Sequence, residues 1–98
     1  MYIVRDIFYL KFGHYRPAKE LLDEAFKKAL LPDIPGSRAL TDFTGDAYRL
    51  IFELPFNSLA EYEQTLTGNL NQEAWQDWYK EFKTHVKSSC REILKQVK

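Results

Sequence analysis

The segment from Tyr2 to Phe12 is a predicted β-strand with large apolar side chains on both of its faces. Side chains alternate between the faces of a strand, which gives Val4, Phe8 and Leu10 on one face and Ile3, Ile7 and Tyr9 on the other. A strand with one solvated face is usually polar on that face. We therefore expect two covers for this strand, with helices on one side and a second copy of the chain on the other.

The remaining pattern alternates between helical and extended segments. Apolar residues recur at three- and four-residue intervals from Ala18 to Leu30, which predicts a helix with Pro17 as its first residue and with Pro32 beyond its end. A hairpin follows, with a weak edge strand over 37–44 and a stronger strand over 47–54 that Pro55 ends.

The second half predicts a broken helix and a last strand. Ser58 and Glu61 form a capping box. We expect residues 68–71 to be non-helical because glycine and asparagine interrupt there, and the last strand to cover 90–97. The order β-α-β-β-α-β is ferredoxin-like and predicts an α+β fold whose four-stranded antiparallel sheet has the spatial order 4-1-3-2, with both helices on one face.

Length and composition exclude several classes of function. The 98 residues suit one domain, 1–98. Fourteen basic and fourteen acidic residues cancel, so nucleic acid is not an expected partner. Apolar runs are too short to span a membrane, and the single cysteine, Cys90, excludes an intrachain disulfide and a zinc-type cysteine pair. We expect a cytoplasmic protein without a metal or cofactor, and we expect Cys90 to be a buried, inert thiol.

Three short motifs stand out along the chain: Leu10-Lys-Phe-Gly13, Trp75-Gln-Asp-Trp78-Tyr79 and Arg91-Glu-Ile-Leu94. They resemble motifs of the NIPSNAP-like proteins of the dimeric α+β barrel superfamily, with Phe12 at the usual place of a proline. The resemblance implies that two sheets pack face to face as a homodimeric barrel. Relatives in this superfamily include cofactor-independent monooxygenases, isomerases and haem-degrading enzymes. The asparagine that haem degraders carry on their first strand is missing here.

Candidate site residues fall into three groups. His14 and His85 are weak catalytic candidates, because an imidazole titrates near neutral pH, but each is also explained as a solvated or helix-end histidine. Aromatic and acidic side chains could bind a flat hydrophobic ligand, or could simply form core; these are Asp6, Tyr48, Tyr62, Trp75 and Tyr79. Charged residues on the apolar strands, Arg5, Arg49 and Glu53, predict a polar network inside the dimer barrel.

Two functions remain open at this point. The first is a NIPSNAP-like homodimer that binds a small molecule or a partner without a reaction of its own, as the absence of a recognisable catalytic constellation favours. The alternative is a cofactor-independent monooxygenase or isomerase that acts on a hydrophobic aromatic small molecule, such as a polycyclic one, which the aromatic late helix favours.

Overall fold

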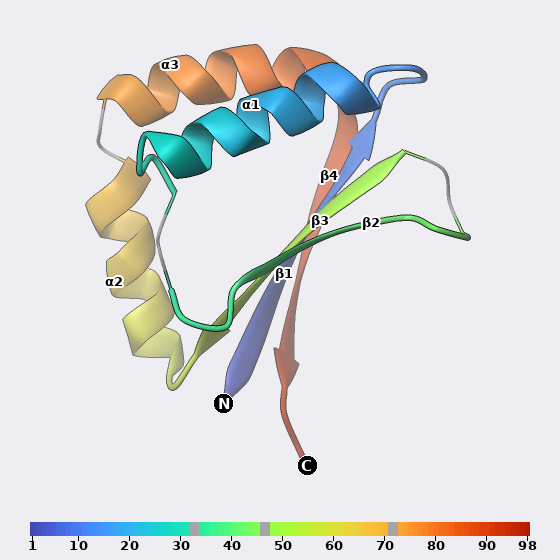
Figure 1. The fold of residues 1–98 in the computed structure, drawn as a ribbon. Helices are drawn as coiled ribbons and strands as arrows, with labels where there is room; N and C mark the ends of the chain where they lie inside the picture. Colours follow the sequence, from blue (N-terminus) through green and yellow to red (C-terminus); the bar gives the residue numbers. More distant parts are fainter. Residues whose placement is uncertain (32–33, 46–47, 71–72) are drawn as a thin grey trace.

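The computed structural model describes residues 1–31, 34–45, 48–70 and 73–98, and has the predicted ferredoxin-like order (Figure 1). Its elements are β1 (Tyr2–Leu10), α1 (Tyr15–Lys27), β2 (Arg38–Thr41), β3 (Arg49–Phe56), α2 (Leu59–Leu70), α3 (Glu73–Phe82), the 3₁₀ turn η1 (Lys83–His85) and β4 (Val86–Lys95). The strand order β2-β3-β1-β4 confirms that β1 and β3 are central. Both neighbours of β1 pair with it in antiparallel direction, as β2 does with β3.

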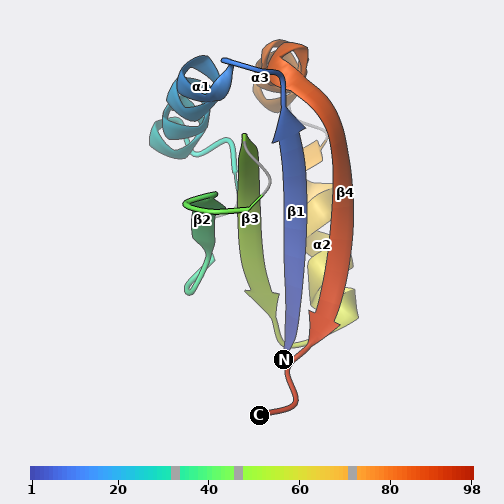
Figure 2. The ribbon, with the colours of Figure 1, turned by 90° about the vertical axis from the view of Figure 1, so that its right-hand side faces the viewer.

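The helices cover the face of the sheet that carries the even-numbered residues of β1 and β3. Leu10 and Leu50 lie in one buried cluster with α1 and α3, and Val4 and Phe56 lie in a second with Tyr62 of α2. The opposite face carries Ile3, Ile7 and Ile51 and is uncovered by any described helix, as Figure 2 shows with α2 behind the sheet. The expectation of helices on one face only is therefore confirmed.

The first helix begins and ends earlier than the sequence predicts. His14 precedes it as the N-cap residue, so Pro17 is the third helical residue, still within the turn whose N–H groups have no intrahelical partner. The helix ends at Lys27, because Ala29 adopts a left-handed conformation with φ of 54°. Leu30 N–H then bonds Ala25 O at 2.9 Å, which is the six-to-one bond of a Schellman motif.

Helix α2 extends further than the sequence predicts. Gly68 is helical, and α2 continues to Leu70, so the expected interruption is wrong over residues 68–70; Asn71 lies outside the described residues. Nothing lies within 4 Å of a Cβ built on Gly68, so no packing conflict accompanies the glycine. The predicted cap at the start of α2 is confirmed, since Glu61 N–H donates to Ser58 Oγ at 3.1 Å. The Glu61 carboxylate reaches back as expected, but it accepts from the N–H of Asn57, one residue before Ser58, at 3.2 Å.

Two strand boundaries and the burial of one side chain also differ from the sequence-based expectations. β3 runs on through Pro55, which pairs with Ile3 of β1. Proline has no backbone N–H to donate to a neighbouring strand. Because β2 begins at Arg38, which lies opposite Glu53, β2 does not extend beside Pro55 and needs no N–H from it. β4 begins at Val86, not at residue 90, and Cys90 on this edge strand is exposed, which makes the expectation of a buried thiol wrong.

Candidate functional site

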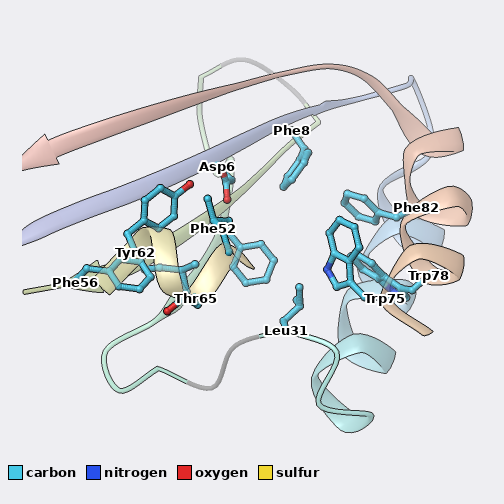
Figure 3. A pocket seen from close by; sticks show the side chains of 12 residues that line it. Asp6, Phe8, Leu31, Phe52, Phe56, Tyr62, Thr65, Trp75, Trp78 and Phe82 are labelled. Atoms are coloured by element: carbon cyan, nitrogen blue, oxygen red, sulfur yellow. The ribbon is translucent and has the colours of Figure 1, made fainter. Parts of the chain in front are cut away.

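An apolar cavity of about 100 Å³ lies between the helix-covered face of the sheet and helices α2 and α3. Figure 3 shows side chains from β1, β3, α2 and α3 converging on it. Its lining consists of Asp6, Phe8, Leu31, Phe52, Leu54, Phe56, Tyr62, Thr65, Leu66, Trp75, Trp78 and Phe82. Most of these side chains are aromatic or aliphatic, which is typical of a small-molecule site.

Local periodicity brings these side chains to the cavity. On the strands, alternation points Asp6 and Phe8 of β1 to the helix side, opposite Phe52 and Leu50 of β3. The lining residues of α2 are Tyr62, Thr65 and Leu66, and those of α3 are Trp75, Trp78 and Phe82. Spacings of three, four and seven residues place each set on one face of its helix.

Aromatic contacts hold the α3 wall in place. Trp78 stacks on Phe82 with ring centroids 4.9 Å apart, and Phe8 meets the same Phe82 ring edge-on at 5.1 Å. The Trp78 Nε1–H donates to Leu21 O at 2.6 Å, which ties α3 to α1 and satisfies the buried indole. Trp78 and Phe82 are therefore core as well as cavity wall.

The Tyr62 hydroxyl is the unusual polar group of this cavity. Tyr62 is only 9 % exposed, and its hydroxyl oxygen is buried without a hydrogen-bond partner in the described part of the chain. Burial raises the pKa of Tyr62, although the nearby Arg91 charge acts in the opposite direction. The hydroxyl is thus protonated at neutral pH and has a donor to offer.

An ion pair lies beside this tyrosine. Arg91 of β4 donates through Nε to Asp6 Oδ1, and its guanidinium lies 5.8 Å from the centre of the Tyr62 ring. Partial burial acts to lower the pKa of Arg91, but the hydrogen bond and charge of Asp6 outweigh it, so the pKa is raised. Sequence reasoning missed Arg91 as a site residue. The antiparallel pairing of the first and last strands, which the fold predicts, was the signal that could have placed Arg91 opposite Asp6.

The five predicted ligand residues divide between the cavity and its surroundings. Asp6, Tyr62 and Trp75 line the cavity. Tyr79 is absent from the described lining and stacks on Trp75 from outside, with ring centroids 5.0 Å apart and planes 7° apart. Tyr48 is also absent from that lining; it has a left-handed φ of 67° and contacts Phe12 at the far end of the sheet.

The two predicted histidines meet each other outside the cavity. His14 Nδ1 and His85 Nδ1 are 2.9 Å apart, so one ring donates and the other accepts. Neither histidine is among the described cavity-lining residues. The described residues contain no cluster of three or more histidine, cysteine or acidic side chains suited to a metal ion.

The charged residues predicted to form a polar network, Arg5, Arg49 and Glu53, lie on the uncovered face of the sheet. Arg49 pairs with a residue outside this set. Arg5 Nε lies 3.0 Å from Glu53 Oε2, an ion pair in which the N–H does not point at the oxygen. Arg49 instead pairs with Asp42, donating from Nη2 to Oδ1 at 2.8 Å. Arg38 and Glu92 join the Arg5–Glu53 pair from the two edge strands.

Comparison with known proteins establishes the fold class. No family model matches this sequence, and no curated protein matches it. A NIPSNAP family protein from Agrobacterium tumefaciens superposes with a TM-score of 0.87 at 17% identity, covering 98% of this chain and 85% of that one. An uncharacterized NIPSNAP domain protein from Burkholderia xenovorans gives 0.85 at 9% identity, covering 99% and 95%.

A more distant fold neighbour is a solved structure described as an antibiotic biosynthesis monooxygenase. It has a TM-score of 0.73 at 13% identity, and both chains are covered over 100% of their length. The chain is therefore a ferredoxin-like α+β domain with the fold of NIPSNAP proteins. None of its described helices has the length and apolar character that crossing a bilayer requires.

Proposed function

We propose that this protein binds a small, mostly apolar molecule that carries one hydrogen-bond acceptor, without a reaction of its own. The Tyr62 hydroxyl carries the proposal, because Tyr62 lines the cavity and its buried hydroxyl has no described partner. Leaving a buried polar group unsatisfied costs about 1–3 kcal/mol. A ligand carbonyl, ether or hydroxyl oxygen that accepts from Tyr62 would recover that cost, so the cavity selects for such a group.

The size of the cavity limits the ligand to a single ring or a short chain. Its volume of about 100 Å³ is below the ~150 Å³ of an engineered apolar cavity that holds benzene. The sequence-based expectation of a polycyclic ligand does not suit this volume. Asp6 and Trp75 would border the ligand, with Asp6 already neutralised by its ion pair with Arg91.

A Tyr62→Phe variant tests this proposal, because it removes the hydroxyl and keeps the ring. We would titrate the wild type and the variant with 2-butanone, which has an acceptor, and with n-pentane, which has none. Loss of one hydrogen bond should weaken 2-butanone binding about tenfold and leave n-pentane binding unchanged. Equal effects on the two ligands, or no saturable binding of either to the wild type, would rule the proposal out.

The alternative function is a cofactor-independent monooxygenase or isomerase. The fold shared with the structure described as an antibiotic biosynthesis monooxygenase supports it. Against it, His14 and His85 are absent from the described cavity lining, and the raised pKa of Tyr62 makes it a poor base at neutral pH. Oxygen uptake with small phenols as substrates separates a monooxygenase from a binding protein, which consumes none. NMR spectroscopy of the recovered ligand separates an isomerase from a binding protein, because only an isomerase returns a changed compound.

We also propose that the protein is a cytoplasmic homodimer formed through the uncovered sheet face. The argument is that this face carries Ile3, Ile51 and Leu94 beside the Arg5–Glu53 pair, and that no described helix covers it. Obligate interfaces commonly bury about 2,000 Å² or more. Analytical ultracentrifugation at low micromolar concentration should give a single species of twice the 11.6 kDa chain mass, and a persistent monomer would contradict the dimer.

A further inference from the structure

A second groove, which we call the hairpin groove, lies at the end of the sheet where β1 leads into α1 and β2 connects to β3. Its volume is about 410 Å³, and small-molecule sites span roughly 300–1,000 Å³. Its described lining combines aromatic rings with polar side chains and includes Tyr15, Thr41, Asp42, Phe43, Thr44 and Tyr48. No described lining residue is shared with the cavity beneath helices α2 and α3, so the two sites are separate.

Hydrogen bonds across the connection between β2 and β3 anchor one wall of the hairpin groove. The Asp42 carboxylate accepts from Arg49 Nη2 at 2.8 Å and from Arg49 Nε at 3.0 Å. Thr41 Oγ1 also donates to Arg49 O at 2.9 Å. Phe43 follows the anchored Asp42 directly, and its ring is fully exposed. A flat ligand placed against Phe43 would therefore take apolar surface out of water beside an anchored segment of backbone.

Tyr48 has an uncommon backbone conformation at the same groove. Its φ of 67° is left-handed, which few bulky residues adopt. Two contacts hold it there: Leu10 N–H donates to Tyr48 O at 2.8 Å, and the Phe12 ring centroid lies 5.3 Å from that of Tyr48. Backbone conformations of this kind gather at ligand-binding sites. The tyrosine that lies outside the helix-covered cavity thus has a groove of its own.

The charges beside the hairpin groove favour an anion. Lys11 and Arg16 are exposed, and the segment 11–16, which includes Tyr15 of the groove lining, contains no acidic residue. Asp42 is the acidic residue of the described lining, and its carboxylate is paired with Arg49. Asp46 lies outside the described residues. The unpaired charge of the described surroundings is therefore positive.

We infer that the hairpin groove binds an aromatic carboxylate. The rings of Tyr15, Phe43 and Tyr48 offer faces and edges to the flat part of such a ligand, since aromatic rings associate in stacked and edge-on arrangements. Lys11 and Arg16 select for the anion, although exposed charges contribute less than stacking does. The inference is independent of the ligand proposed for the helix-covered cavity, because the two sites have no described lining residue in common.

A titration with 2-naphthoate, followed by the amide NMR signals of the wild type, tests the inference. An apolar cavity of ~150 Å³ holds benzene, so two fused rings are too large for the helix-covered cavity of about 100 Å³. We expect saturable shifts at Tyr15, Thr44 and Tyr48, and unchanged signals at Tyr62 and Trp75. Shifts confined to the helix-covered cavity, or no saturable binding, would overturn the inference.

Phe43→Ala tests the stacking contact. The ring is fully exposed, so its truncation should leave the fold intact. Loss of one aromatic contact should weaken 2-naphthoate binding about fivefold. Leu59→Ala is the control, because it truncates an exposed apolar side chain on α2, away from the groove. An affinity that is the same in the wild type and in Phe43→Ala would contradict the binding site.

The double variant Lys11→Gln with Arg16→Gln tests the charge. It should weaken 2-naphthoate binding about fivefold and leave 2-naphthalenemethanol, which has the same rings without a charge, unchanged. Lys95→Gln with Lys98→Gln removes the same net charge at the opposite end of the sheet and should change neither titration. Equal effects of the first pair on the two compounds would overturn the anionic ligand. Tyr62→Phe should leave both titrations unchanged, which keeps this test separate from that of the proposed function.

Discussion

His14 and His85 share a hydrogen bond between their Nδ1 atoms at 2.9 Å, although 71 positions separate them in the chain. His14 is the N-cap residue of α1, and His85 is the last residue of η1. Backbone bonding at the same place supports the contact, since Lys11 N–H donates to His85 O at 2.9 Å. The pair thus joins the end of β1 to the start of β4.

A double-mutant cycle with His14→Ala and His85→Ala should reveal coupling between the two rings. A neutral hydrogen bond contributes about 0.5–1.5 kcal/mol to the free energy of unfolding, and contacting residues are not additive. We expect the double variant to lose less stability than the two single variants summed, by about that amount. Urea unfolding of all four proteins measures this, and strict additivity would mean that the bond is absent in solution.

Phe82→Ala should be among the most destabilising substitutions in the chain. Its ring is 1 % exposed and contacts both Phe8 and Trp78. Truncating a buried phenylalanine costs about 3–5 kcal/mol, which denaturant titration would detect directly. Phe43→Ala is the control, because that ring is fully exposed and should change stability by less than about 0.5 kcal/mol. Similar losses at both positions would contradict the core described above.

The ion pair of Asp42 with Arg49 should make stability depend on pH in the acid range. Hydrogen bonds from Arg49 hold the pKa of Asp42 below its ordinary value. A carboxyl with a lowered folded-state pKa stabilises the fold above the unfolded pKa of about 3.9, and loses this contribution as pH falls through the lower folded value. Asp42→Asn should therefore be less stable than the wild type at pH 6, with the difference closing below about pH 4.

Urea midpoints at a series of pH values between 2 and 7 would follow that difference. Asp23→Asn serves as the comparison, since Asp23 pairs with Lys19 on the exposed side of α1. Solvent screens such an exposed helical pair, so this variant should change stability little at any pH in the series. A stability difference for Asp42→Asn that stayed constant across the acid range would show that its carboxylate charge is not the cause.

Two glycine-to-alanine changes should act in opposite directions. Gly68 is helical and has open space at its Cβ position, so Gly68→Ala should raise stability by about 0.5–1 kcal/mol. Gly36 has φ of 88°, and a Cβ there would lie 3.2 Å from Pro55 Cγ. Gly36→Ala should lower stability by about 1–2 kcal/mol. Thermal unfolding would rank the three proteins, and a stabilised Gly36→Ala would contradict this geometry.

The order of elements, the capping box and the central place of β1 and β3 could be predicted from the sequence, because they depend on local periodicity. Three of the five predicted ligand residues, Asp6, Tyr62 and Trp75, also line the cavity. Local propensity misplaced the helix break, because Gly68 lies within α2 although glycine has a low helix propensity. The same local reasoning ended β3 before Pro55. The proline is tolerated in β3 because β2 does not extend beside it, and this depends on how the strands pair in the sheet.

Tertiary structure alone decided which face of β1 meets the helices, because both faces are apolar and alternation cannot rank them. It also decided the pairings that span the chain. Asp6 with Arg91, and His14 with His85, bring together residues 85 and 71 positions apart. Such contacts follow from strand register and helix packing, which fix side chains to within ångströms. The sequence by itself determined the elements, and the assembled sheet and helices determined the neighbours of each site residue.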